Sequence, residues 1–150
     1  MAITVRPLTA ADADFVAPLF GAYLDFYGVD RNPAAEKTFL EARLSAADST
    51  GLGAFVDGKV VGFTLCHHAY NSLRLAPAWI LHDLFVSPEH RRNGIAEALI
   101  EAVHTRAKAA GACEVILSTA HGNKNAQALY EKLGYAMDTK FRVYVRDLLS

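Results

Sequence analysis

The sequence is poor in cysteine, with only Cys66 and Cys113 among its 150 residues. Two cysteines do not make the disulfide framework of a small secreted domain, so we expect reduced thiols and a cytoplasmic protein. The first residues, MAITVRPLT, lack a basic stretch followed by an apolar one, so no signal peptide is expected. No window approaches about eighteen uninterrupted apolar residues, so no membrane span is expected either.

The sequence also lacks an excess of charge of either sign. The formal net charge is −1, and lysines and arginines are scattered apart from the pair Arg91–Arg92. We therefore expect no nucleic-acid and no membrane partner. The hydrophobic fraction of 52% is ordinary for a compact protein, and the length predicts a single domain spanning residues 1–150.

Several familiar site motifs are absent as well. There is no G-x-x-x-x-G-K-[ST] and no G-x-G-x-x-G after the first strand, so neither a P-loop nor a dinucleotide-binding site is predicted. The histidines show no H-E-x-x-H and no cysteine–histidine pairing, so no metal site is predicted.

The apolar spacing predicts an alternation of strands and helices. Strands are expected at 3–6, 52–56, 59–68, 78–86 and 113–119, followed by a last hairpin of 137–139 and 141–148. Helices are expected from the capping box at 9–12 to Gly28, from the Asn32–Pro33 start through Leu44, from 95 to about 110, and after Asn123. Pro18 predicts a kink or a later start in the first helix.

The most informative segment is 84–99, LFVSPEHRRNGIAEAL. A buried-looking strand ends here, and a basic turn carrying Gly94 leads into a helix. Free backbone N–H groups at a helix N-terminus bind anions, and glycine lets the backbone come close to them. The segment therefore predicts a phosphate site.

Two motifs in this order resemble the GCN5-related N-acetyltransferases (GNAT). Arg91, Gly94 and Ala96 match the Q/R-x-x-G-x-G/A motif of that family, which binds the pyrophosphate of acetyl-CoA. About thirty residues later, 123–135 reads NKNAQALYEKLGY and is similar to the second family motif, N-x-x-A-x-x-L-Y-x-K-x-G-F/Y. The resemblance implies a mixed α/β fold, with a twisted mixed sheet of about six to seven strands flanked by about four helices.

The resemblance implies acetyl-CoA as co-substrate. The residues expected to bind it are Phe85, Val86, Arg91, Arg92, Asn93, Gly94, Ile95, Ala96, Asn125, Tyr130 and Lys132. Tyr130 matches the general acid of the family, although its spacing also fits a core aromatic. Asn125 either bonds the pantetheine arm or caps its helix.

The catalytic base is expected on the strand 78–86. In the polyamine and thialysine branch of the family this strand reads like Φ-E-D-Φ-F-V, whereas here His82 stands in place of the glutamate, followed by Asp83. Histidine is suited to accept a proton near neutral pH, so His82 is the predicted base and Asp83 the second candidate. Strand alternation predicts that the two side chains lie on opposite faces.

Acceptor binding is expected in the first two helices and their loop. The aromatic and acidic residues Tyr23, Asp25, Tyr27, Asp30 and Glu36 suit a cationic amine, although a solvated loop explains them equally well. The predicted function is direct acetyl transfer to the primary amine of a small molecule such as a polyamine, lysine analogue or amino acid. The alternatives are a protein lysine or N-terminal acetyltransferase and a non-catalytic acyl-CoA sensor. The resemblance also implies pairing through C-terminal strands, for which the apolar run 143–145 is suited, so a homodimer is expected.

Overall fold

The computed structural model describes residues 1–149, which form two compact units, 1–118 and 119–149. The single domain expected over residues 1–150 stays a prediction. Among the described residues, no helix has the length and apolar character that a membrane crossing requires.

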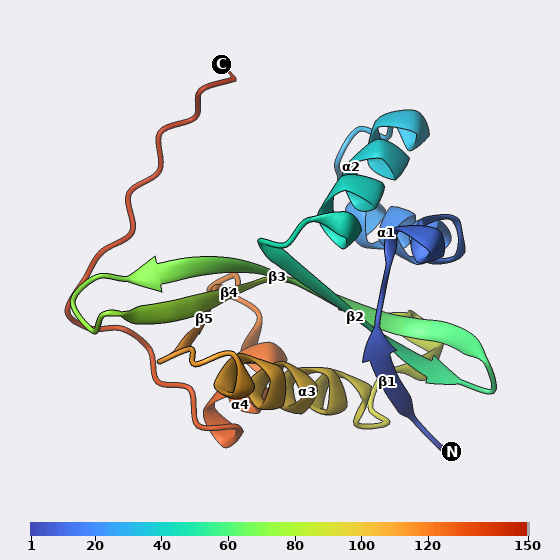
Figure 1. Ribbon diagram of the computed structural model, residues 1–150. Coiled ribbons are helices and arrows are strands. Elements are labelled where there is room, and N and C mark those ends of the chain that lie inside the picture. The colour runs from blue at the N-terminus through green and yellow to red at the C-terminus, as the bar shows by residue number, and fades with distance from the viewer. Residues whose placement is uncertain (150) are drawn as a thin grey trace. The chain divides into compact units, whose positions relative to one another are not determined.

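The first unit is a five-stranded sheet with helices on both faces (Figure 1). Its elements are β1 (Thr4–Pro7), η1 (Ala10–Asp12), α1 (Ala13–Phe26), α2 (Pro33–Ser45), β2 (Ser49–Val56), β3 (Lys59–Asn71), β4 (Ala76–Val86), η2 (Pro88–His90), α3 (Ile95–Ala109) and β5 (Val115–Leu117). The strands lie in the order β1-β2-β3-β4-β5. All neighbours are antiparallel except β4 and β5, which are parallel, so the sheet is mixed as expected.

The helices follow local sequence signals. The backbone N–H of Thr9 donates to the Asp12 carboxylate at 2.8 Å, one half of the predicted capping box. The Asn32 side chain accepts from the Ala35 N–H at 3.2 Å and caps α2. The helix α1 contains Pro18 but starts at Ala13, so the predicted late start was wrong.

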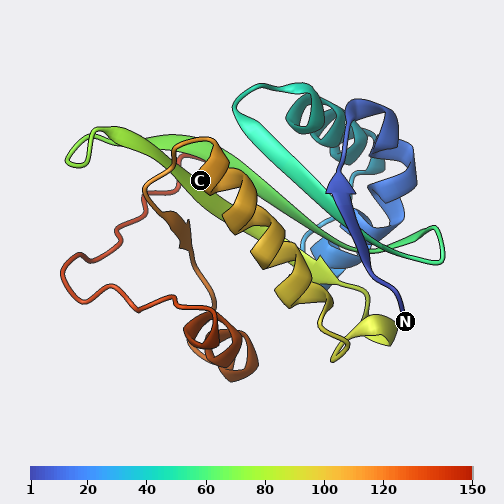
Figure 2. The same cartoon turned by 60° about the horizontal axis from the view of Figure 1, so that its bottom comes forward.

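Helices α1 and α2 cover one face of the sheet and α3 covers the other (Figures 1 and 2). The core on the α1 side contains Phe20 from α1, Leu40 from α2 and Phe63 from β3. On the opposite face, a Cβ built on Gly62 would lie 3.0 Å from Ile95 and 3.2 Å from the carbonyl oxygen of Phe85. Glycine at this position therefore lets the start of α3 pack close to the end of β4.

The second unit contains one helix, α4 (Lys124–Lys132), and no strand among its described residues. The predicted hairpin of 137–139 and 141–148 was wrong, and the sheet has five strands rather than six to seven. Val143, Tyr144 and Val145 are each about nine-tenths exposed. Their apolar run gives strand propensity, but a strand forms only with a partner to pair with, and no described segment pairs with this one.

Candidate active site

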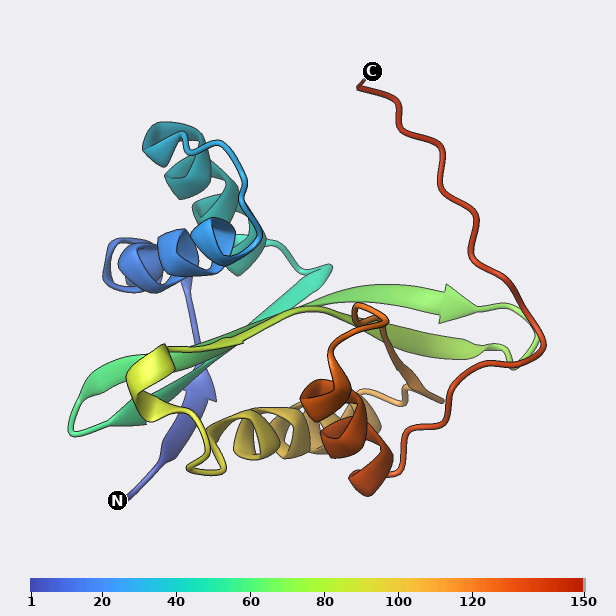
Figure 3. The same cartoon turned by 180° about the vertical axis from the view of Figure 1, so that it is seen from behind.

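The predicted phosphate loop lies between β4 and α3 (Figure 3). Gly94 is the N-cap of α3 with φ +79°, a conformation that favours glycine. The first intrahelical bond runs from the Ala98 N–H to the Gly94 carbonyl, so the N–H groups of the first turn point out of the helix end. Residues 91–94 are exposed, whereas Ile95 is buried. The geometry is that of an anion site at a helix N-terminus.

Arg91 ties this loop to the end of β4. Its Nε donates to the Val86 carbonyl at 3.1 Å. Its guanidinium lies over the rings of Phe85 and Phe26, at 5.3 and 5.7 Å from their centroids. The Arg91 side chain thereby connects the end of β4, the loop and the end of α1. These contacts hold the first part of the loop that leads into α3.

The edge of β4 is open next to this loop. The short strand β5 pairs only with Trp79–Leu81 of β4. Beyond Leu81, no strand in the described part of the chain pairs with β4 on that side. An open strand edge offers backbone N–H and C=O groups to an extended ligand. The edge at 82–86 leads directly from the predicted base to the phosphate loop.

A β-bulge brings His82 and Asp83 together. Leu65 pairs with Asp83 and the next residue of β3, Cys66, pairs with Leu81, so His82 is the extra residue. The bulge breaks the strict alternation of side chains. His82 Nδ1 lies 3.3 Å from Asp83 Oδ1. The prediction that these two side chains lie on opposite faces was therefore wrong.

Two hydroxyl groups hold Asp83. The Tyr23 hydroxyl of α1 donates to Asp83 Oδ1 at 2.6 Å. The fully buried Thr64 of β3 donates its hydroxyl to the Asp83 carbonyl at 2.7 Å. The Asp83 side chain is 12% exposed, whereas the His82 side chain is 66% exposed. The bulge thus presents His82 to solvent on a carboxylate that is itself fixed.

A second histidine lies against this pair. The ring of His67 on β3 is 5.4 Å from that of His82, centroid to centroid. Partial burial lowers the pKa of His67, and the neighbouring His82 lowers it further by a smaller amount. His67 and Thr64 are the two residues near the bulge that the sequence did not single out. The one available signal was Thr64, a lone hydroxyl inside the apolar run 60–66.

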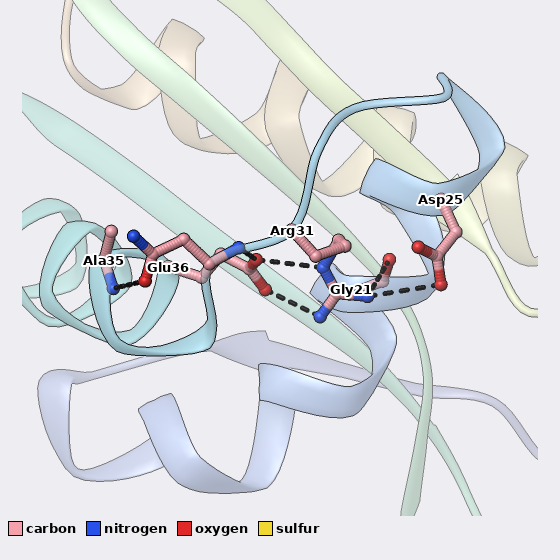
Figure 4. A network of polar contacts seen from close by, with 6 residues as sticks. Gly21, Asp25, Arg31, Ala35 and Glu36 are labelled. Atoms are coloured by element: carbon pink, nitrogen blue, oxygen red, sulfur yellow. Dashed lines mark hydrogen bonds and ion pairs between the residues drawn. The ribbon is translucent and has the colours of Figure 1, made fainter.

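The loop between α1 and α2 is held by Arg31 (Figure 4). Its guanidinium makes two bonds to the Glu36 carboxylate, at 2.9 and 2.7 Å, and one to Asp25 at 3.2 Å. It also donates to the Gly21 carbonyl at 3.1 Å. Two of the carboxylates predicted to bind an amine therefore already face an internal cation.

The other residues predicted to bind the acceptor differ in their surroundings. Tyr23 is engaged by Asp83, and the ring of Tyr27 packs edge-on against that of Tyr23. Tyr27 and Asp30 are exposed. Their roles in acceptor binding remain predictions.

In the second unit, α4 carries the residues of the second motif. The Asn123 side chain accepts from the Ala126 N–H and caps the helix, while Asn125 lies within it, so the alternative that Asn125 is the cap was wrong. At the other end the Tyr135 and Gly134 N–H groups bond the carbonyls of Tyr130 and Glu131, a Schellman motif with Gly134 at φ +94°. Tyr130 is half-buried, and its ring is 5.9 Å from that of Tyr135.

The comparison with known families decides the assignment. The model of the Acetyltransferase (GNAT) family matches residues 16–135. This chain belongs to the GNAT family. The family range includes the open edge of β4, the phosphate loop and α4.

Several GNAT relatives match along most of the chain. The uncharacterized N-acetyltransferase YhfO of Bacillus subtilis is 36% identical over 142 residues, which cover 95% of each chain. An aminoglycoside N(6')-acetyltransferase type 1 of Stenotrophomonas maltophilia is 30% identical over 150 residues, covering 95% of this chain and 92% of that one. A crystal structure described as "a probable acetyltransferase" is 33% identical, with a TM-score of 0.90 and coverage of 99% of this chain and 98% of that one.

A shorter match is to a thialysine acetyltransferase, a member of the branch that the β4 sequence resembles. The thialysine N-epsilon-acetyltransferase of Caenorhabditis elegans is 30% identical over 95 residues, 60% of this chain and 56% of that protein. The GNAT assignment makes the protein an N-acetyltransferase by family. The acceptor amine is a separate question.

Proposed function

We propose that this GNAT protein transfers the acetyl group of acetyl-CoA to the primary amine of a small molecule, such as a polyamine, a lysine analogue or an amino acid. One observation carries the proposal. The open edge of β4 runs from the bulge at His82 to the loop at Arg91–Ala96. An extended ligand along this edge would have its anionic end at α3 and its reactive end beside His82.

The loop fits the pyrophosphate of acetyl-CoA. The backbone N–H groups of Arg92 through Ala96 lie at the positive end of the α3 dipole, and the two exposed arginines add charge-assisted contacts. A Cβ on Gly94 would meet no atom within 4 Å, so nothing fills the approach to this part of the loop. Asn93 and Ile95 complete the loop, and Asn125 and Lys132 of α4 complete the set proposed from the second motif.

The strand provides the next contacts. In this proposal the backbone of Phe85 and Val86 pairs with the pantetheine arm, and an N–H group there stabilises the oxyanion that develops on the thioester carbonyl. The Val86 carbonyl already accepts from Arg91. That bond holds the strand end in place while the other groups of the edge stay open.

His82 is the proposed base. The acceptor ammonium gives one proton to His82, directly or through one water, and the neutral amine nitrogen then attacks the thioester carbon to form the new C–N bond. The C–S bond breaks, and the sulfur takes a proton from the Tyr130 hydroxyl. The acylated nitrogen releases its second proton to solvent, and solvent returns a proton to Tyr130. The products are the N-acetylated amine and CoA, so no acyl-enzyme is needed.

Asp83 and Tyr23 position the base. Asp83 lies close enough to His82 Nδ1 to orient the ring and to stabilise it once it carries the proton. Tyr23 fixes the carboxylate from α1. Asp83 also remains the second candidate for the base itself, because its carboxylate lies at the same bulge.

The acceptor is proposed to be a small cation. Two relatives carry names of enzymes that act on aminoglycosides and thialysine, which both present amines. In this chain Arg31 balances Asp25 and Glu36, so Asp30, Tyr27 and the Asp83 carboxylate are the groups left to attract an amine. Fewer acidic groups favour a monoamine or amino acid over a long polyamine.

A thiol-release assay with acetyl-CoA tests this proposal. The panel contains polyamines, lysine analogues, amino acids, aminoglycosides and lysine peptides, each with wild type and with Tyr130→Phe. Turnover of one class of small amine, reduced in the variant, supports the proposal. Turnover of peptides alone establishes the protein acetyltransferase, and tight acetyl-CoA binding without any turnover establishes the sensor. No binding of acetyl-CoA overturns the role of the Arg91–Ala96 loop.

We also propose a homodimer and a cytoplasmic location. The exposed run Val143–Tyr144–Val145 is an apolar surface suited to a second copy, and both cysteines are unpaired. Sedimentation of wild type and of a variant with Val143 and Val145 changed to Thr tests the dimer. A monomer for both overturns it.

A further inference from the structure

Three metal-binding side chains meet at the bulge, although the sequence shows no metal motif. They are His67 from β3 and His82 and Asp83 from β4. Each offers one ligand atom, and the three atoms lie within 4.8 Å of one another. His67 has no role in the reaction proposed above.

The fold explains why residues 15 positions apart converge. His67 shares a sheet face with Phe63 and Leu65, the face covered by α1. The bulge then puts both His82 and Asp83 within reach of that face. A regular strand would have left only one of the two there.

Two of the three ligands have a hydrogen bond from a residue outside the cluster. His67 Nδ1 lies 3.3 Å from the Ser49 hydroxyl, which leaves Nε2 for a metal. The Tyr23 hydroxyl bonds one oxygen of Asp83 and leaves lone pairs on the other. Outer hydrogen bonds of this kind fix the orientation of ligands in known metal sites.

The donor set suits one group of cations. Two imidazoles and one carboxylate favour transition metals such as Zn²⁺ over Mg²⁺ or Ca²⁺. Metal–ligand distances of about 2.0–2.2 Å place ligand atoms roughly 3.3–3.6 Å apart in a tetrahedral site. The exposed His82 side chain can turn to close the remaining gap. Arg43, the nearby cation, is paired with Asp48 at 3.0 Å.

We propose that His67, His82 and Asp83 form a Zn²⁺ site, and that Zn²⁺ bound there inhibits acetyl transfer by occupying the base. The inhibitory half rests on the proposed function of His82. The binding half stands on the cluster alone. Three protein ligands leave a fourth position for water.

Direct metal binding tests the first half. Tag-free wild type, His67→Gln and His104→Gln are dialysed against Zn²⁺, and Co²⁺ is added separately to record its visible absorption. His104 lies on α3, away from the cluster, and controls for adventitious histidine binding. Wild type and His104→Gln are expected to bind one equivalent and give the same Co²⁺ bands. His67→Gln is expected to bind about tenfold more weakly or worse.

Equal affinity in His67→Gln and wild type overturns the site, and so does the absence of stoichiometric binding in wild type. These results do not depend on any activity, so they are distinct from a failure of the proposed function. The inhibitory half is tested with the acceptor found in the panel. Zn²⁺ should inhibit wild type, EDTA should restore it, and His67→Gln should resist. Binding without inhibition overturns the inhibitory half.

Discussion

The phosphate loop and the β4 bulge are built from different parts of the chain. The loop offers backbone N–H groups at the start of α3, and its shape depends on the left-handed conformation of Gly94. The bulge offers side chains, and its shape depends on hydroxyl groups from Tyr23 and Thr64 on other elements. Substitutions that change the backbone conformation should therefore impair the loop. Substitutions that remove single side-chain atoms should impair the bulge.

The largest effect is expected from His82→Gln. Loss of a general base lowers kcat by about 10²- to 10⁴-fold, while acetyl-CoA binding at the loop stays unchanged. Steady-state kinetics and calorimetric titration with acetyl-CoA measure the two separately. His104→Gln is the control. Full activity in His82→Gln would leave Asp83 as the base.

The next effect is expected from Thr64→Val. The substitution keeps the shape but leaves the Asp83 carbonyl without its hydroxyl partner, which costs about 1–3 kcal/mol of folding free energy. We expect kcat to fall several-fold, since the bulge relaxes, with no change in acetyl-CoA affinity. Thr105→Val on α3 removes an exposed hydroxyl and should change stability by less than about 0.5 kcal/mol. Equal denaturation midpoints for the two variants would contradict this account.

A matched pair of glycines tests the loop. Gly94 has φ +79° and Gly111, just after α3, has φ +82°, and a Cβ meets no atom within 4 Å at either position. Alanine at each should therefore cost about 1–2 kcal/mol through backbone strain alone. Only Gly94→Ala should also weaken acetyl-CoA binding, by about tenfold if a strain of roughly 1.4 kcal/mol is relieved by moving the loop. Equal acetyl-CoA affinities would separate the loop from CoA binding.

The smallest effect is expected at the Arg31 network between α1 and α2. The guanidinium of Arg31 lowers the pKa of Glu36 below its ordinary value of 4.5. The ionised Glu36 therefore stabilises the fold above that value, and this contribution is lost as pH falls through the lowered pKa. Melting temperatures of wild type and Glu36→Gln should differ slightly at pH 7 and converge in acid. A difference that grows in acid would contradict the pairing.

The same contrast explains what the sequence predicted. The loop is contiguous, and glycine, arginine and helix start lie within residues 91–96, so local chemistry was enough. The bulge depends on how β3 and β4 pair, and a register shift at Leu65–Cys66 leaves no local signal. The last hairpin was predicted from propensity alone, which does not specify a partner strand. His67 was missed because its neighbours come from another strand.

The Arg31 contacts have a consequence for association. Gly21, Asp25 and Glu36 belong to the two helices that flank the connecting loop, and one guanidinium joins all three. The loop is thereby ordered before any acceptor arrives. Binding then does not have to immobilise this segment, which lowers the entropic cost of the encounter. If an amine binds at the loop between α1 and α2, the loop should already have its bound conformation. The association rate should then be set by diffusion and orientation rather than by rearrangement.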